Sequence, residues 1–184
     1  MLAVTKIMIK SVKAKSNNQE KKLAKKIGAT QVPASGAVRF GGYDLNHPLA
    51  CIEAKYTDEI HYTLKFNDLE KIRKIALSKN KIPVLVIEFR QLGTAYAVVD
   101  ALCIREATTG KPIDVTTKTI KFSESTLRAE TGAARVILNW VNESKGKLWH
   151  VIEFNLFNKE YLLPKPAEEL AKEATNGNTT TTTN

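Results

Sequence analysis

Apolar residues in the first hundred positions follow the order expected of a strand, a helix and a second strand. Residues 49–56 open with an apolar run that predicts a strand buried at its start. A capping-box pattern at Asn67 predicts a helix, and residues 83–89 are continuously apolar, as central parallel strands are. The apolar face of that helix comprises Leu69, Ile72, Ile75 and Ala76. This succession predicts a βαβ unit with a right-handed crossover.

Other elements flank this unit. Capping-box spacing from Asn17 to Glu20 predicts a helix that ends at Gly28, and a glycine-rich approach at residues 31–42 follows it. Further strands are expected at residues 96–102, 136–141 and 150–157. The pattern predicts an α/β fold in which a mixed central sheet is flanked by helices and carries additional C-terminal β elements.

Length and composition are those of one soluble domain. The chain has 184 residues, of which 43% are hydrophobic and 26% charged, enough to bury a sizeable core. We expect a single domain over residues 1–163, with a core at about 17–103 and a C-terminal extension at 104–163. Residues 164–184 have a short possible helix and a threonine-rich end, so we expect a polar, disordered tail.

The expected location is the cytoplasm, or the host cytoplasm if the protein is viral. No stretch approaches the roughly 20 apolar residues that span a bilayer, and lysines interrupt the N-terminal apolar residues where a signal peptide would be continuous. Cys51 and Cys103 each lie in an apolar run, which favours buried thiols in a reducing compartment over a disulfide.

The charge is strongly basic and unevenly distributed. The net charge is +9, and eight lysines stand against the single acid Glu20 in the first 26 residues. A basic surface favours polyanions, nucleic acid above all, because binding releases counterions from phosphates. Chains encoded by AT-rich genomes are also lysine-rich without binding DNA, so charge alone leaves both interpretations open.

The candidate chemistry lies at Asp44, Glu53 and Lys55. Residues two apart on a strand project from the same face, so Glu53 and Lys55 lie side by side. The turn at residues 46–48 folds the preceding segment back and brings Asp44 across from Glu53. Two carboxylates make a site for Mg²⁺ or Mn²⁺, and a lysine beside it can orient an attacking water and offset the charge of a phosphorane.

A solvated strand edge is the alternative, because Glu-x-Lys is common on exposed strands. The context favours chemistry. Residues 49–52 are apolar, which indicates a central strand, and a charged pair at its end belongs where a sheet opens to a cleft.

With these residues in place, residues 20–89 resemble the PD-(D/E)xK nuclease core, most closely Holliday junction resolvases of the archaeal Hjc type and their phage relatives. Cys51-Ile52-Glu53-Ala54-Lys55 is similar to that family's Cys-Ile-Glu-Val-Lys strand. Tyr43 stands where the family motif usually has proline. Many members place a glutamine on the following helix, where the nearest candidate is Asp68, itself explained by the capping box.

The resemblance implies a restriction-endonuclease-like fold and roles for further residues. It implies that Glu20 joins Asp44 and Glu53 in binding metal, although Glu20 also fits the capping box as a local partner. Ser35 matches the family's loop serine and would contact the scissile phosphate. The proposed DNA-binding cations are Lys10, Lys13, Lys15, Lys21, Lys25 and Arg39.

The leading hypothesis is therefore a magnesium-dependent endodeoxyribonuclease that cleaves branched DNA, with Mn²⁺ as a substitute metal. It would resemble a Holliday junction resolvase and act as a homodimer, since a four-way junction presents two symmetry-related strands. One alternative is a restriction-like or repair endonuclease on linear duplex, with base-reading elements in residues 105–163. The other is a DNA-binding module without catalysis.

Overall fold

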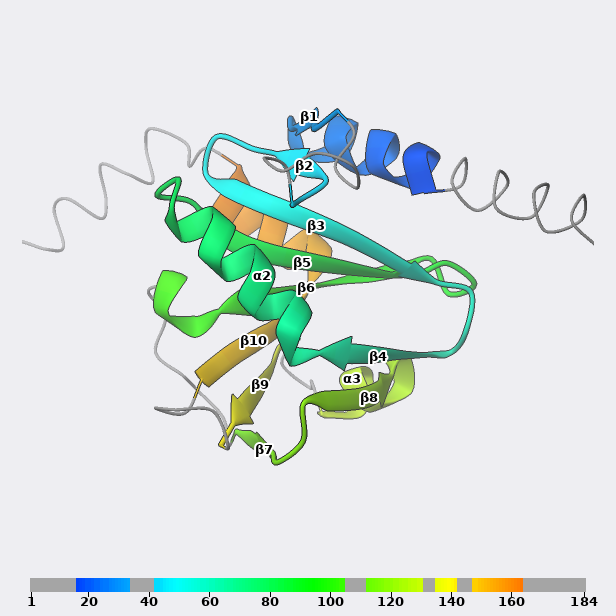
Figure 1. The fold of residues 1–184 in the computed structure, drawn as a ribbon. Helices are drawn as coiled ribbons and strands as arrows, with labels where there is room; N and C mark the ends of the chain where they lie inside the picture. The colour runs from blue at the N-terminus through cyan, green and yellow to red at the C-terminus, as the bar shows by residue number, and fades with distance from the viewer. Residues whose placement is uncertain (1–15, 34–41, 105–111, 131–134, 142–146, 164–184) are drawn as a thin grey trace, which may run out of the picture.

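The structure is a computed structural model in which a large twisted sheet has helices on both faces (Figure 1). It describes residues 16–33, 42–104, 112–130, 135–141 and 147–163. The expected polar tail therefore lies outside the described residues. No described helix is both long enough and apolar enough to cross a membrane.

The elements follow one another from the blue N-terminal helix, residues 16–27, to the orange C-terminal end (Figure 1). The strands are β1 (Thr30–Gln31), β2 (Leu45–Asn46), β3 (Ala50–Thr57), β4 (His61–Lys65), β5 (Ile82–Phe89), β6 (Thr94–Asp100), β7 (Ile113–Val115), β8 (Thr119–Ser123), β9 (Arg135–Trp140) and β10 (Lys147–Glu153). The helices are α2 (Phe66–Leu77), α3 (Glu124–Glu130) and α4 (Phe154–Phe157), with the short 3₁₀ helix η1 (Ala101–Cys103) and the π-helix η2 (Asn158–Leu162).

The central sheet is mixed, which confirms the predicted fold class. Its order is β1-β2-β3-β5-β6-β10-β9-β7. β3 and β5 pair in parallel through α2, so the predicted βαβ unit is present. β6 pairs antiparallel with β5, and β10 pairs antiparallel with β6. The C-terminal strands β7, β9 and β10 therefore continue the same sheet as the predicted core.

The predicted strand at 150–157 is wrong in its second half. β10 ends at Glu153, and residues 154–157 form α4. The Glu153 carboxylate accepts a hydrogen bond from the backbone nitrogen of Leu156 (3.0 Å), which caps the new helix. Phe154 and Phe157 are fully buried on this helix, whereas the apolar run alone had suggested a strand.

A separate two-stranded sheet, β4 paired with β8, was not predicted. The predicted start of α2 at an Asn67 cap is therefore wrong, because β4 leads directly into the helix at Phe66. The Phe66 nitrogen donates to the carbonyl of Lys118, and no side chain caps the helix. Asn67 is thus a helical residue rather than a cap, and the Glu70 carboxylate pairs with Lys147 instead (2.5 Å).

The N-terminal helix also begins differently from the prediction. Ser16 is already helical, so Asn17 does not cap the helix. The Glu20 carboxylate bonds to side chains instead, accepting from the Ser16 hydroxyl (3.0 Å). Gly28 ends the helix with a positive φ of 67°, as predicted, because glycine adopts this conformation without strain.

Two apolar layers cover the sheet. α2 packs on one face with Leu69 against Leu85 and Ile87. The N-terminal helix and α4 pack on the other face, where Ile27 and Phe154 join the cluster of Ile52, Val86 and Ile152. Because side chains alternate along β3, its odd-numbered residues from 51 to 55 face α2.

Candidate active site

Glu53 and Lys55 lie side by side on β3, beneath α2. The Lys55 Nζ is 2.7 Å from the Glu53 Oε1, and their side chains are 36% and 14% exposed. They follow the fully buried residues Cys51 and Ile52. The charged pair thus lies where β3 leaves the buried interior and becomes accessible to solvent.

Asp44, the residue before β2 begins, lies next to this pair. The β2–β3 register pairs Leu45 with Ile52, and the Asp44 nitrogen donates to the Ile52 carbonyl (2.9 Å). The Asp44 Oδ2 accepts from the backbone nitrogen of Ala54 (2.8 Å). This side chain therefore lies next to β3, just before the β2–β3 ladder begins.

A second side chain extends the same arrangement. Gln19, on the N-terminal helix, donates from its Nε2 to the carbonyl of Lys55 (3.2 Å). The Asp44 side chain thus satisfies a backbone donor at the outer edge of β3, where an unpaired group would otherwise invite another strand, and Gln19 adds a contact to the next residue along β3. β3 is held at the point where Glu53 and Lys55 project.

The electrostatics of the cluster favour a bound cation. Burial raises the pKa of Glu53, and the charge of Asp44 raises it further, while Lys55 and Lys71 oppose both. Burial by itself lowers the pKa of Lys55, but its hydrogen bond to Glu53 and the charges of both acids outweigh burial, so the pKa is raised. Two acids that repel each other, beside a lysine held charged, are a pair of carboxylates that a divalent cation could occupy.

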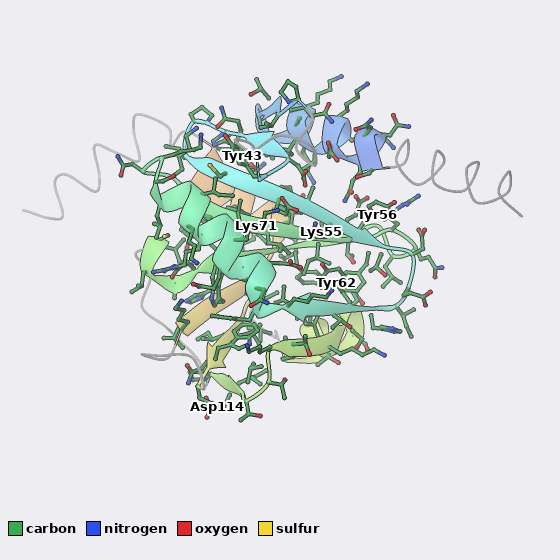
Figure 2. All side chains as sticks on the ribbon, viewed as in Figure 1. Tyr43, Lys55, Tyr56, Tyr62, Lys71 and Asp114 are labelled. Atoms are coloured by element: carbon green, nitrogen blue, oxygen red, sulfur yellow. The ribbon has the colours of Figure 1, made fainter. Side chains whose placement is uncertain are left out.

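Two further residues belong to the cluster and were not predicted. Lys71 on α2 acts on Glu53 by its charge, and its side chain passes close to Gly42, two residues before Asp44. Tyr62 on β4 has a pKa raised by burial, with the charges of Lys55, Asp68 and Glu53 acting on it. Figure 2 labels Lys55, Tyr62 and Lys71 on β3, β4 and α2.

These two residues were missed for different reasons. Tyr62 lies on a strand that was not predicted, between two predicted elements. Lys71 stands two positions after Leu69 and one before Ile72, so it is adjacent to the apolar face of α2. That spacing marks a residue at the boundary of a packed face, a signal that was available in the sequence.

Glu20 does not join Asp44 and Glu53 in a group of three carboxylates. It is 7% exposed, and its Oε2 accepts from the Nε2 of Gln31 (2.5 Å). Gln31 pairs with Leu45 in the β1–β2 ladder, which places Glu20 near the strand that leads from Asp44. No set of three or more acids, histidines or cysteines among the described residues is arranged to hold a metal ion.

The other predicted site residues are exposed or undescribed. Lys21 and Lys25 are exposed on the N-terminal helix. The remaining ones lie outside the described residues, and they are Lys10, Lys13, Lys15, Ser35 and Arg39.

Asp44 and Glu53 suit Mg²⁺ both in the number of ligands and in their type, which is carboxylate oxygen. This ion commonly takes one or two protein carboxylates and keeps several waters, and the acids lie next to each other at the edge of a buried strand. Their mutual repulsion would be relieved by a divalent cation.

Comparisons with known proteins give a weak similarity in structure. No protein-family model matches the chain, and no curated protein is similar to it in sequence. Among solved structures the chain is similar to Hjc of Archaeoglobus fulgidus, described as a Holliday junction resolvase from an archaeal hyperthermophile. The TM-score is 0.42 at 16% identity, covering 60% of this chain and 89% of that chain. At this level of similarity, function has to be argued from the site.

Proposed function

We propose that the protein is a metal-dependent endodeoxyribonuclease whose site is built from Asp44, Glu53 and Lys55. The observation that carries the proposal is their convergence: Asp44 is bonded to the Ala54 nitrogen, directly after Glu53, and Glu53 is paired with Lys55. Two adjacent carboxylates beside a charged lysine, in a basic protein, suit hydrolysis of a phosphodiester.

The acids and the lysine have distinct roles. Asp44 and Glu53 would hold Mg²⁺, with Mn²⁺ as a substitute, and Glu20 would contribute to metal binding through water. The metal, when bound, lowers the pKa of a water and neutralises phosphate charge. Lys55 orients the attacking water and offsets charge on the phosphate as bonds change. The pairing with Glu53 keeps Lys55 protonated for the second task.

The proposed substrate is branched DNA, with a Holliday junction as the leading candidate and a homodimer as the active form. The exposed lysines of the N-terminal helix, Lys21 and Lys25, would contact phosphates together with Lys10, Lys13, Lys15 and Arg39. Ser35 would contact the scissile phosphate. Because several phosphate contacts exchange for counterions, binding should weaken steeply as salt rises.

The test is cleavage of a labelled four-way junction and of a matching linear duplex, with and without Mg²⁺. Asp44→Asn, Glu53→Gln and Lys55→Met run beside the unaltered protein. The matched control is Asp114→Asn, an exposed carboxylate on β7 that Figure 2 labels far from Lys55. We expect the three site variants to lose at least about 100-fold in rate, as is typical for removing one catalytic group, and the control to keep its activity.

Binding in EDTA, measured on the same variants, separates chemistry from affinity. Paired nicks confined to the junction support a resolvase, and equal cutting of linear duplex supports the restriction-like or repair alternative. Tight metal-independent binding with no cleavage under Mg²⁺ or Mn²⁺ overturns the enzymatic proposal and leaves a DNA-binding module.

A further inference from the structure

Tyr62 lies on the α2 face of the sheet, near the end of β3 that carries the candidate active site. Its ring centroid is 6.4 Å from that of Phe122 on β8, and Phe122 is 6.5 Å from Phe89 at the end of β5. β5 pairs with β3 so that Ile87, two residues before Phe89, is opposite Lys55. Residues two apart on a strand share a face, so this row of aromatic rings places Tyr62 near Lys55.

The electrostatic interactions of Tyr62 agree with this placement. Tyr62 and Lys55 each act on the other by charge, and Glu53 and Asp68 also act on Tyr62. Figure 2 labels Tyr62 on β4 beside Lys55 on β3. The tyrosine therefore stands at the candidate active site, on the side that β4 forms.

Packing accounts for the ring of Tyr62 but not for its hydroxyl. The ring is partly buried against the apolar cluster under α2, where phenylalanine would fill the same space. The hydroxyl makes no hydrogen bond with any described residue. It is not among the buried polar atoms without a partner in the described part of the chain. The hydroxyl is therefore accessible to solvent and to a ligand bound at the site.

This hydroxyl is a neutral hydrogen-bond donor. Burial raises the pKa of Tyr62 above its ordinary value of 10.0, Lys55 opposes the rise, and the charges of Asp68 and Glu53 add to it. The phenol therefore keeps its proton at neutral pH and can donate to an anion. The Lys55 Nζ, by contrast, is already 2.7 Å from the Glu53 Oε1.

A phosphate at this site needs more donors than Lys55 supplies. Asp44 and Glu53 repel a phosphate that approaches them, and Lys55 is shared with Glu53. A donor that is fixed in place beside the phosphate stabilises its charge without having to reorganise. Tyr62 has such a donor, held by the contact of its ring with Phe122.

We propose that Tyr62 is a catalytic residue whose hydroxyl donates a hydrogen bond to a non-bridging oxygen of the scissile phosphate, beside Lys55. In the hydrolysis the water oxygen bonds to phosphorus, the bond to the leaving oxygen breaks, and one proton of the water ends on the leaving oxygen. Tyr62 keeps its own proton and stabilises charge on the phosphate while these bonds change. The inference rests on the proposed function, because its ligand is the phosphate cleaved there.

The experiment compares Tyr62→Phe with the unaltered protein in single-turnover cleavage under Mg²⁺. Phenylalanine keeps the ring against Phe122 and removes only the hydroxyl. The substrate is the DNA that the unaltered protein cuts, used as the normal phosphate and with a phosphorothioate of either configuration at the cleaved bond. Tyr161→Phe, on η2 and packed against the cluster on the opposite face of the sheet, is the matched control. Affinity in EDTA and thermal midpoints are measured on all three proteins.

We expect Tyr62→Phe to cleave at least about tenfold more slowly, the size expected from one hydrogen bond to a charged group. Its affinity and thermal midpoint should stay near those of the control. Sulfur accepts hydrogen bonds less well than oxygen, so the diastereomer with sulfur facing Tyr62 should be cut slowly by the unaltered protein. That substitution should slow Tyr62→Phe less, because the variant has already lost the bond. The other diastereomer should be slowed by the same factor in both proteins.

Other outcomes separate this inference from the proposed function. Cleavage by Tyr62→Phe at the full rate, in a protein whose activity needs Asp44 and Glu53, overturns the inference alone. A slower variant in which both diastereomers keep their full effect means that Tyr62 shapes the site without touching the phosphate, and also overturns it. So does a rate that falls only in proportion to affinity or stability. A protein that cuts no DNA under Mg²⁺ or Mn²⁺ removes the proposed function and the inference together.

Discussion

Single residues at the outer edge of β3 combine structural and chemical roles. The Asp44 carboxylate accepts from the Ala54 nitrogen and also lies beside Glu53. Asp44→Asn keeps an oxygen that can accept this bond, whereas Asp44→Ala leaves a backbone donor at an open sheet edge. A loss of cleavage in the asparagine variant therefore reports on charge and metal binding rather than on the position of the strand.

His47, three residues further on, gives a pH-dependent prediction. Burial lowers the pKa of His47, the charge of Lys81 lowers it further, and its Nδ1 accepts from the Leu49 nitrogen (3.2 Å). The unfolded chain takes up a proton on this ring near pH 6.5, but the folded protein resists it. Stability is therefore present above that pH and falls as the pH drops toward the lowered value.

His47→Asn keeps an acceptor for the Leu49 nitrogen but cannot be protonated. We expect the free energy of unfolding, from urea titrations at pH 7 and pH 5, to fall less in His47→Asn than in the unaltered protein. Protonation ends a hydrogen bond worth about 1 kcal/mol. Parallel losses in the two proteins would show that His47 has no part in the acid response.

At the scale of elements, the site depends on how closely the segment before β2 approaches α2. A Cβ added at Gly42 would overlap the Cδ1 of Ile75, and it would lie 3.5 Å from the Cε of Lys71. This segment leads directly to Asp44. The absence of a side chain at residue 42 therefore sets the distance between the segment that carries Asp44 and the helix that carries Lys71.

Gly42→Val should push the segment away from α2. We expect a loss of about 1–3 kcal/mol in stability, the usual cost of overpacking, and slower DNA cleavage. Adding Ile75→Ala to the valine variant removes the clashing atom and should restore part of both, with Ile75→Ala alone as the control. Gly42→Ala should cost little, because the tip of a flexible side chain can shift. Stability and cleavage that are unchanged in Gly42→Val would contradict the close approach.

At the scale of the whole molecule, the C-terminal part completes the main sheet. β10 pairs with β6 along five residues of register, and β9 and β7 extend the sheet beyond it. Trp149 and Val151 belong to the cluster under α2, while Ile152 and Phe154 belong to the opposite cluster. One strand thus contributes to both apolar layers.

Truncation tests this dependence. A chain of residues 1–104 loses β10 and exposes the edge of β6, so we expect no cooperative unfolding transition and strong binding of a hydrophobic dye. A chain of residues 1–163, which lacks only the predicted tail, is the control and should unfold as the full chain does. A cooperative transition in the shorter chain would mean that the first hundred residues fold independently.

The local pattern was sufficient for the central unit. The helical spacing of Leu69, Ile72 and Ala76 correctly identified the buried face of α2, and the apolar run at 83–89 identified the parallel strand. Capping boxes were less reliable. Asn67 and Asn17 have the right neighbours, but tertiary partners available to Glu70 and Glu20, namely Lys147, Gln31 and Ser16, replaced the local bonds.

The sequence by itself determined the βαβ unit and the pair of Glu53 and Lys55, because both depend on short-range periodicity along the chain. Tertiary structure decided the rest. Pairing between distant strands placed β10 beside β6 and β4 beside β8, and packing brought Lys71 and Tyr62 to the acids and left Gln19 with an unpaired oxygen. These contacts join residues far apart in sequence, and no local pattern encodes which of them will meet.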